Sequence, residues 1–320
     1  MTRSLFELVE DYIDLRRSLG YKLRGQDRYL RGFARFVNRL GHHGPVPLEV
    51  SVAWANSTSS TDACHSARRL TIVRGFLRYL AAIDTATDVP PPGLLGPTTR
   101  RKPPHIYSDA EIASLLQAAA ALSPHAGLRP HCYATLFALL ACTGLRISEA
   151  LALNREDVDL LDGILTVRHG KGDRMRIVPL HPSALSPMRD YASRRDHWRG
   201  SRMRGAFFRT ERTERLTYTA VRNTFQSLRL RLGWTAQGRA RIPRLHDLRH
   251  WMVVHRLLLW YSQDIDVDRK IAALATYLGH VVISDVYWYF SAAPELMSVV
   301  AHRFERFSQP TDQEAHHESC

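Results

Sequence analysis

Lysine, cysteine and long apolar segments are all scarce in this sequence. Only four of its 44 basic residues are lysine, and the other 40 are arginine. The four cysteines show neither a CxxC pair nor the spacing of a zinc finger, which fits a reducing, cytoplasmic location. We expect two of them, Cys132 and Cys142, to be buried as small apolar residues.

No segment has the length and composition of a membrane helix. The most apolar short run, 251–261, contains His255 and Arg256 and falls far short of the roughly 20 apolar residues that a bilayer requires. The first residues include Glu7 and contain no apolar core of signal-peptide length. We therefore expect neither secretion nor a membrane partner.

The net charge indicates a polyanionic partner. The 320 residues carry 44 basic and 31 acidic side chains, a formal charge of +13, and 45% of the residues are hydrophobic. This hydrophobic fraction can fill protein cores and excludes a disordered chain, and the length predicts about two domains. The positive excess favours nucleic acid as the partner, although a general preference for arginine would also produce it.

Residues 1–87 have the pattern of a helical domain. Ser4 and Glu7 form a capping box, and apolar residues then recur along one helical face. A long helix expected over 62–83 places its apolar residues inward and presents a row of arginines on its outer face. That face is either solvated or lies against DNA phosphates. Its candidate phosphate contacts are Arg68, Arg69 and Arg74.

A segment rich in proline and glycine, 88–105, separates this domain from the next. It cannot continue a helix, and its composition predicts an extended linker. Its basic end contains two further candidates for DNA contact, Arg101 and Lys102. A second capping box, Ser108 with Glu111, begins a new helix directly afterwards.

Residues 106–308 are expected to form a larger, mainly helical domain with a small β-sheet. Segments 164–167 and 176–180 have the composition of strands, and the glycines of HGKGD between them suit a hairpin turn. The final residues, 309–320, are polar and are expected to be disordered. Helices are expected at 131–142, 147–153, 218–232, 245–260, 267–278 and 294–307.

Four short segments of the larger domain combine side chains that can act on a phosphate. They are TGLRISEALAL at 143–153, RHGKGDRMRIVPL at 168–180, LHDLRH at 245–250 and YLGHVVISDVYWYF at 277–290. Each is weak evidence by itself, because arginine, lysine and tyrosine are common at exposed or half-buried sites. Their order along the chain carries more weight than any one of them.

In that order the segments resemble the tyrosine recombinase (phage integrase) family, whose members break and rejoin DNA. The family pattern is an arginine in T-G-x-R-x-x-E, a lysine in a β-hairpin, H-x-x-R, and L-G-H followed nine residues later by a tyrosine. The stretch TYLGHV…YWYF…PEL looks most like recombinases encoded together in multi-recombinase transposons. The matching residues are Arg146 with Glu149, Lys171, His246, Arg249, His280 and Tyr289.

The resemblance implies cleavage of a phosphodiester with Tyr289 as the nucleophile. Two guanidiniums, those of Arg146 and Arg249, would hold the phosphate oxygens, where negative charge builds up during the attack. The product would be a 3′-phosphotyrosyl link. Because that link conserves the energy of the broken bond, neither ATP nor a metal cofactor is expected.

The remaining motif residues are assigned to proton transfer and orientation. His246 is the candidate base for the tyrosine hydroxyl, a group whose ordinary pKa is about 10, and Lys171 is the candidate acid for the departing 5′ oxygen. The scarcity of lysine supports that role, because arginine is too weak an acid to donate a proton. His280 would hydrogen-bond a non-bridging oxygen, and Glu149 would orient or neutralise an arginine.

The resemblance also implies an architecture and partners. The N-terminal domain would be a core-binding domain that closes with the catalytic domain as a clamp on duplex DNA. Strand exchange would take a homotetramer on two DNA sites, with sister recombinases or accessory proteins as further partners, in the cytoplasm on the nucleoid. The outcome would be integration, excision or transposition of a mobile element.

Three alternatives stay open at this point. A type IB topoisomerase would use the same chemistry to relax DNA, and a non-catalytic DNA-binding protein would keep the motif only to bind phosphate. A metal-dependent hydrolase would use His246, Asp247 and His250, although an HD dipeptide alone is weak evidence. We expect His250 to be structural, and Tyr287, a second phenol near Tyr289, to pack rather than react.

Overall fold

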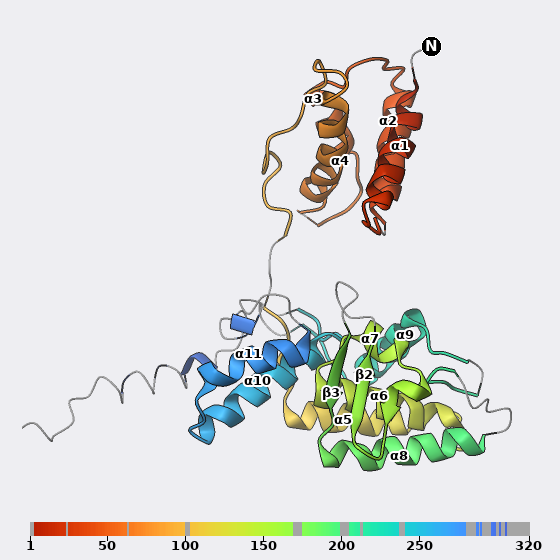
Figure 1. Ribbon diagram of the computed structural model, residues 1–320, viewed down its shortest axis with the longest axis vertical. Helices are drawn as coiled ribbons and strands as arrows, with labels where there is room; N and C mark the ends of the chain where they lie inside the picture. The colour runs from red at the N-terminus through yellow and green to blue at the C-terminus, as the bar shows by residue number, and fades with distance from the viewer. Residues whose placement is uncertain are drawn as a thin grey trace, which may run out of the picture. The chain divides into compact units, whose positions relative to one another are not determined.

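The computed structural model divides into two compact units, 1–101 and 102–320 (Figure 1), and each has a hydrophobic core of its own. Among the described residues no helix is both long and apolar enough to span a membrane. The structure describes residues 3–23, 25–62, 64–99, 103–168, 175–198, 205–211, 214–236 and 241–279, with Val286, Tyr287, Tyr289, 296–298, Ala301 and Glu305.

The described part of the N-terminal unit is built from four helices. The capping box at its start is present, since Ser4 Oγ accepts from the Glu7 N–H at 3.3 Å and the Glu7 carboxylate accepts from the Ser4 N–H at 2.8 Å. Buried aromatic rings join the helices, because Phe33 packs edge-on against both Trp54 and Phe76. The helices are α1 (Leu5–Ser18), α2 (Gln26–Arg39), α3 (Leu48–Asn56) and α4 (His65–Ala81).

The C-terminal unit is mainly helical, with one small sheet among its described residues, which confirms the predicted fold class. The sheet is antiparallel in the order β1-β2-β3, formed by β1 (Val158–Asp159), β2 (Ile164–Val167) and β3 (Arg176–Pro179). The other elements are α5 (Asp109–Ala120), α6 (Leu128–Thr143), α7 (Ile147–Ala152), the 3₁₀ turn η1 (Arg155–Asp157), α8 (Pro182–His197), α9 (Tyr218–Arg231), α10 (Asp247–Ser262) and α11 (Val267–Leu278).

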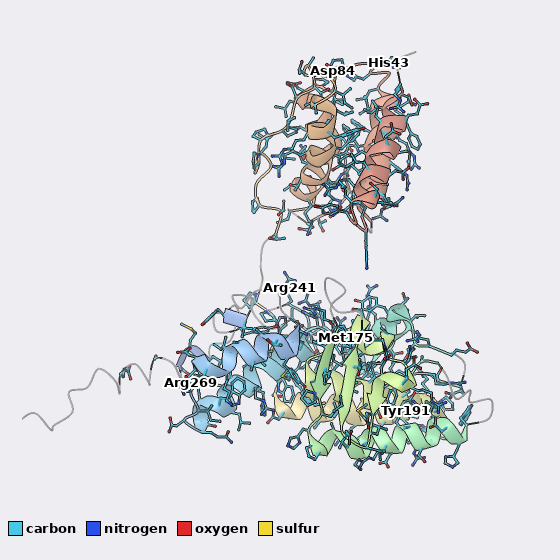
Figure 2. The ribbon with its side chains drawn as sticks, in the orientation of Figure 1. His43, Asp84, Met175, Tyr191, Arg241 and Arg269 are labelled. Carbon is cyan, nitrogen blue, oxygen red and sulfur yellow. The ribbon has the colours of Figure 1, made fainter. Side chains whose placement is uncertain are left out.

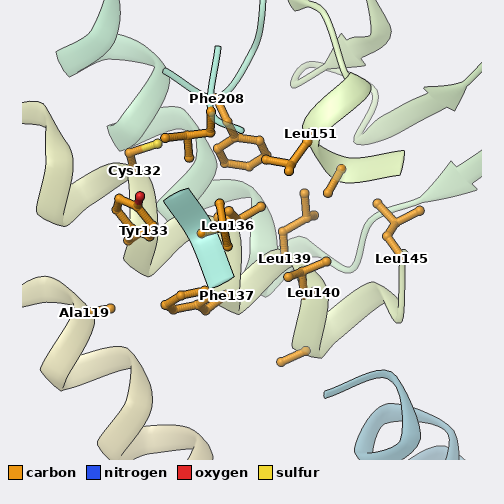
Figure 3. Packing of buried hydrophobic residues seen from close by; sticks show 14 of the residues in the cluster. Ala119, Cys132, Tyr133, Leu136, Phe137, Leu139, Leu140, Leu145, Leu151 and Phe208 are labelled. Atoms are coloured by element: carbon orange, nitrogen blue, oxygen red, sulfur yellow. The ribbon is translucent and has the colours of Figure 1, made fainter. Parts of the chain in front are cut away.

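Helix α6 is the central element of this unit, and its apolar side chains fill the core (Figure 3). It contacts α5, α8 and α10. A helix that is apolar on nearly all sides is stable only inside a core, so the C-terminal end of α6 is held firmly in place. Its buried residues include Cys132, Tyr133, Leu136, Phe137, Leu139 and Leu140.

The two cysteines of α6 differ in burial. Cys132 is buried, as expected, whereas Cys142 is exposed. The prediction for Cys142 is wrong because the last turn of α6 borders a surface pocket of about 450 Å³, which Met252 and Tyr277 also line.

Helix α8 is absent from the sequence-based expectations because it contains two prolines. Pro182 lies in the first turn, where a missing N–H leaves no hydrogen bond unmade. Pro187 lies inside the helix, where proline normally disrupts the hydrogen-bond ladder. The helix is anchored by Tyr191 (Figure 2), whose hydroxyl donates to the carbonyl of Phe207 at 3.1 Å. Tertiary packing therefore stabilises a helix that local propensity argues against.

The other helices expected in this unit lie close to their predicted positions. Those expected at 218–232, 245–260 and 267–278 are α9, α10 and α11, with ends that differ by two residues or fewer. The expected helix 294–307 lies mostly outside the described residues, and the tail 309–320 lies entirely outside them.

Candidate active site

Several motif residues meet in one cluster of the C-terminal unit, in which Glu149, Arg249 and Tyr289 are buried, Arg146 is half-buried and His246 is exposed. Arg146 precedes the first turn of α7, and Arg249 lies in the first turn of α10. Tyr289 follows α11 and is 3% exposed. Hydrogen bonds and ring contacts join these segments. The structure therefore brings together Arg146, Glu149, His246, Arg249 and Tyr289, while Lys171 and His280 lie outside the described residues.

The turn between α6 and α7 requires the glycine of the T-G-x-R segment. Gly144 ends α6 in the left-handed conformation, with φ at 62°. A Cβ at this position would lie 2.4 Å from Met252 Cε and 3.2 Å from Leu278 Cδ2. A side chain here would have to displace the ends of the Met252 and Leu278 side chains, so the glycine lets the end of α6 pack closely on α10 and α11, where Arg249 lies near Arg146.

Replacing Gly144 with alanine should destabilise the protein by up to about 1 kcal/mol more than the same change at Gly233, because the ends of the Met252 and Leu278 side chains must move aside. Gly233 also has a left-handed φ, at 69°, but a Cβ added there would meet no atom within 4 Å. Both variants carry the backbone cost, so their difference isolates the clash with Met252 and Leu278. Urea denaturation of the two variants measures it, and equal losses would show that the turn tolerates a side chain.

Glu149 is a buried carboxylate that organises the start of α7. It accepts hydrogen bonds from the Arg146 N–H at 3.0 Å and from Arg146 Nη1 at 2.9 Å. It also accepts from Arg176 Nη1 at 3.1 Å and Nη2 at 2.8 Å. Burial raises the pKa of Glu149, but the hydrogen bonds from Arg176 and Arg146 outweigh burial and hold it below its usual value. The residue is therefore an anion that orients two arginines.

Arg249 is buried, at 2% exposure, and connects three parts of the unit. Its Nη1 donates to the carbonyl of Gly144 at 2.6 Å, and its Nη2 donates to the carbonyl of Leu278 at 2.8 Å. Burial lowers the pKa of Arg249, and its interaction with Tyr289 offsets only part of that effect. Because guanidinium has five N–H donors, donors are left for the tyrosine and for a phosphate.

The end of α11 gathers three arginines from separate elements. The successive carbonyls of 277–279 accept hydrogen bonds from Arg176 Nε, Arg249 Nη2 and Arg146 Nη2, at 3.0, 2.8 and 3.4 Å respectively. The C-terminus of a helix carries partial negative charge, which favours cations there. Gly279 ends the helix with φ at 67° and is the last described residue before His280. The helix end thus fixes the spacing of the arginines.

His246, which directly precedes α10, forms a chain of ring contacts with His250 of α10 and Tyr289. The His246 and His250 rings meet edge to face with centroids 5.0 Å apart, and the His250 and Tyr289 rings lie 5.2 Å apart. Although His246 is exposed at the surface, desolvation by its neighbours lowers its pKa, and the charge of Arg249 lowers it further. His246 is therefore neutral at pH 7 and able to accept a proton. The contact of His250 with Tyr289 was not anticipated, although its position four residues after His246 places both on one helical face.

If His246 is the base, the rate of DNA cleavage should fall in acid with an apparent pKa below the usual 6.5 of histidine, because the site disfavours imidazolium. Protonation removes the acceptor, so the loss occurs as the pH drops through that value. His246→Asn should slow cleavage by about 10²–10⁴-fold, and the rate of this variant should no longer fall at low pH. His255→Asn, which changes an exposed histidine of α10, should keep the wild-type pH dependence. If the cleavage rate of His246→Asn still falls at low pH as it does in wild type, His246 is not the base.

The two neighbouring phenols have different environments. Tyr289 is 3% exposed and interacts with Arg249, whereas Tyr287 is 52% exposed. Tyr287 is thus not the packed residue that the sequence led us to expect. Tyr289 is therefore the buried phenol of the pair, and it lies at the arginine cluster.

The buried aspartate next to His246 belongs to a different interaction. Asp247 accepts from the backbone N–H of Arg244 at 2.9 Å and from Arg244 Nη2 at 3.0 Å. Within the described residues no group of three His, Cys, Asp or Glu side chains is placed to hold a metal ion. The His246, Asp247 and His250 set considered for a hydrolase does not converge, since Asp247 is turned to Arg244.

The arginines of α4 differ in the contacts that their side chains make within the N-terminal unit. Arg68 pairs with Asp62. Arg69 stacks over Trp54 with its Cζ 4.2 Å from the ring centroid, and its Nη2 donates to the Trp54 carbonyl at 2.7 Å. Arg74 is half-buried. The linker candidates Arg101 and Lys102 lie outside the described residues.

Arg176 is the site residue that the sequence reading missed. It appeared only as the first residue of an expected strand, yet its side chain is 11% exposed and contacts both Glu149 and the end of α11. One signal was available, because an arginine among the apolar residues of a short strand needs a buried counter-ion. Glu149 was the acidic residue that the motif already supplied.

Comparison with known proteins places the chain in a family. The model of the phage integrase family matches residues 107–295. A protein of Sinorhizobium fredii (strain NBRC 101917 / NGR234) named as an integrase/recombinase, y4rB, is 38% identical over 306 residues, which cover 94% of this chain and 96% of that protein. The chain therefore belongs to the phage integrase family, and the tyrosine recombinase prediction is confirmed.

Solved structures share the fold at lower sequence identity. The integrase of transposon Tn1549, in complex with transposon right end DNA, matches with a TM-score of 0.67 and 17% identity, over 96% of this chain and 100% of that one. A lambda integrase tetramer bound to a Holliday junction matches with a TM-score of 0.60 and 19% identity, over 88% of this chain and 78% of that one. These likenesses agree with the fold class predicted from the sequence.

Proposed function

We propose that the chain is a site-specific DNA recombinase, which breaks and rejoins DNA through a 3′-phosphotyrosyl intermediate during integration, excision or transposition of a mobile element. One observation carries the proposal: the buried Tyr289 interacts with Arg249, which donates to the Leu278 carbonyl, and Arg146 is held on the next carbonyl, that of Gly279. A nucleophile and two phosphate-binding groups thus share one site. Membership in the phage integrase family supports the same reaction.

The proposed reaction balances without ATP or a metal ion. The Tyr289 oxygen attacks the phosphorus in line with the 5′ oxygen, so that a bond from phosphorus to the tyrosine forms and the bond to the 5′ oxygen breaks. Arg146 and Arg249 stabilise the charge on the non-bridging oxygens. In the second half, a 5′ hydroxyl attacks the phosphotyrosine and restores the DNA backbone. The phosphotyrosyl bond keeps the energy needed for rejoining.

Two protons move in the cleavage step. The phenolic proton passes to His246, whose lowered pKa leaves it neutral, and the departing 5′ oxygen takes a proton from Lys171. His280 donates a hydrogen bond to a non-bridging oxygen. The roles of Lys171 and His280 rest on their places in the family motif. Glu149 holds Arg146 in position.

The DNA partner is expected to contact both units. We assign DNA binding to a core-binding domain, 1–87, and a linker, 88–105, with catalysis in 106–308. A homotetramer on two duplex sites would carry out strand exchange, with sister recombinases or accessory proteins as further partners, in the cytoplasm on the nucleoid. The tetrameric state of a lambda integrase with the same fold supports this assembly. The candidate phosphate contacts are Arg68, Arg69, Arg74, Arg101 and Lys102.

A nicked substrate tests the proposed function. The substrates are duplexes from the ends of the encoding element, and each carries a nick a few nucleotides from a candidate cleavage position. Cleavage then releases the short strand between the two breaks. Without that strand the DNA cannot be rejoined, so the covalent intermediate accumulates. We expect a protein–DNA adduct on a denaturing gel in the presence of EDTA. Binding without any adduct would favour a DNA-binding protein. Metal-dependent cleavage without an adduct would favour a hydrolase, and relaxation of plasmids that lack such ends would favour a topoisomerase.

A further inference from the structure

We propose that Arg176 is a positioning residue of the recombinase site, which keeps Arg146 available to the scissile phosphate by sharing the Glu149 carboxylate. This inference rests on the proposed function of the same site. Arg176 lies outside the residues that the sequence motif supplied, and its role follows from its contacts.

Arg176 holds Glu149 with a two-point contact. It lies at the hairpin end of β3, where it pairs with Val167 of β2. Its Nη1 and Nη2 donate to Oε1 and Oε2 of Glu149 at 3.1 and 2.8 Å. The side chain of Arg146 reaches only one of these oxygens, with Nη1 2.9 Å from Oε1. The planar guanidinium of Arg176 therefore takes the bidentate position on the carboxylate.

The charges explain why this arrangement favours phosphate binding. Arg146, Arg176 and Arg249 contribute three positive charges and Glu149 one negative charge, so the cluster has a net charge of +2. Glu149 is 2% exposed at its side chain, and charges interact strongly where water is excluded. Arg146 already contacts both carboxylate oxygens, through Nη1 to Oε1 and its backbone N–H to Oε2, so without Arg176 the charge of Glu149 would act on Arg146 alone. That pairing would neutralise Arg146 and turn its donors away from the phosphate.

The same side chain also fixes the backbone that leads to His280. Arg176 Nε donates to the carbonyl of Tyr277 at 3.0 Å. A Cβ on Gly279 would lie 2.9 Å from Arg176 Nη1, so the guanidinium packs directly on the glycine that ends α11. Arg146 Nη2 contacts the carbonyl of Gly279 at 3.4 Å. One residue thus links the start of β3, the start of α7 and the end of α11.

A double-mutant cycle between Arg176 and Glu149 tests the proposal. The full chain is assayed by single-turnover cleavage of the nicked substrate at saturating protein, and DNA affinity is measured in parallel. Arg176→Met should slow cleavage by about 10–100-fold, because small displacements of catalytic groups have effects of this size. Its affinity for DNA should stay within about threefold of wild type. Adding Glu149→Gln should make the double variant at least about threefold faster than Arg176→Met, because no carboxylate is left to neutralise Arg146.

The control replaces an arginine that also bridges two segments but lies elsewhere. Arg189 of α8 donates to the carbonyl of Leu160 from an exposed position, and Arg189→Met should cleave like wild type. A residue that acts only by stabilising the fold would give no recovery in the double variant. The proposal is overturned if Arg176→Met cleaves within about twofold of wild type, if weaker DNA binding accounts for the whole loss, or if the double variant is no faster.

The outcomes separate this inference from the function on which it rests. If wild type forms no adduct, the proposed function fails. If wild type forms the adduct and Arg176→Met does so equally fast, only the role of Arg176 fails. Should Arg176→Met not fold, Arg176→Lys replaces it in the same cycle, because lysine keeps the charge but cannot contact both carboxylate oxygens and the Tyr277 carbonyl together. Wild-type rates in Arg176→Lys would then overturn the proposal.

Discussion

Tyr289→Phe should abolish covalent attachment to DNA and slow strand cleavage by at least about 10³-fold. The substitution removes one oxygen atom and leaves the ring, so the contact with His250 can be kept. Folding and DNA binding should therefore be close to those of wild type. The adduct on the nicked substrate, measured on a denaturing gel, reports the result.

The matched control for this experiment is the second phenol. Tyr287→Phe removes the same atom two residues away, from a side chain that is 52% exposed. It should form the adduct at a rate within about threefold of wild type, as expected for a surface substitution away from the reacting atoms. If Tyr287→Phe loses the adduct and Tyr289→Phe keeps it, the nucleophile has been assigned to the wrong residue.

Arg249→Ala should slow cleavage by about 10²–10⁴-fold, the range associated with losing a preorganised donor for transition-state charge. The effect has two sources. The phosphate loses a guanidinium, and the carbonyls of Gly144 and Leu278 lose the donor that joins the end of α6 to the end of α11. The substitution should consequently lower the melting temperature as well as the rate.

A second substitution separates these two sources. Arg249→Lys keeps the positive charge but offers three donors from one nitrogen in place of a planar fork. We expect it to recover part of the stability and little of the rate. Arg256→Ala, which changes an exposed arginine two turns further along α10, should leave the rate unchanged. An Arg249→Lys variant that cleaves at the wild-type rate would show that charge alone suffices.

Much of the helical framework could be predicted from local sequence signals. The capping box at Ser4 and Glu7 and the one at Ser108 and Glu111 are both present, because each depends only on side chains three residues apart. Helix α8 was missed for the converse reason. Its stability comes from contacts such as that of Tyr191 with a distant carbonyl, which no local pattern records.

The same distinction between local signals and distant contacts applies to the candidate site. The identities of Arg146, Arg249 and Tyr289 follow from motif order, since chemistry fixes which residue types can hold a phosphate and attack it. Their supporting contacts were not predictable, because the partners lie far apart in sequence. Arg176 reaches Glu149 across 27 residues and the Tyr277 carbonyl across 101, and only the folded chain brings these groups together.

The identity of the covalently attached residue is the most direct test of the account. The adduct formed with the nicked substrate can be digested with protease and nuclease, and the modified peptide can be sequenced by mass spectrometry. We expect a 3′-phosphate of the DNA on the oxygen of Tyr289, with a free 5′ hydroxyl on the released strand. A link through Tyr287 or any other residue, or a 5′-phosphate in the link, would contradict it.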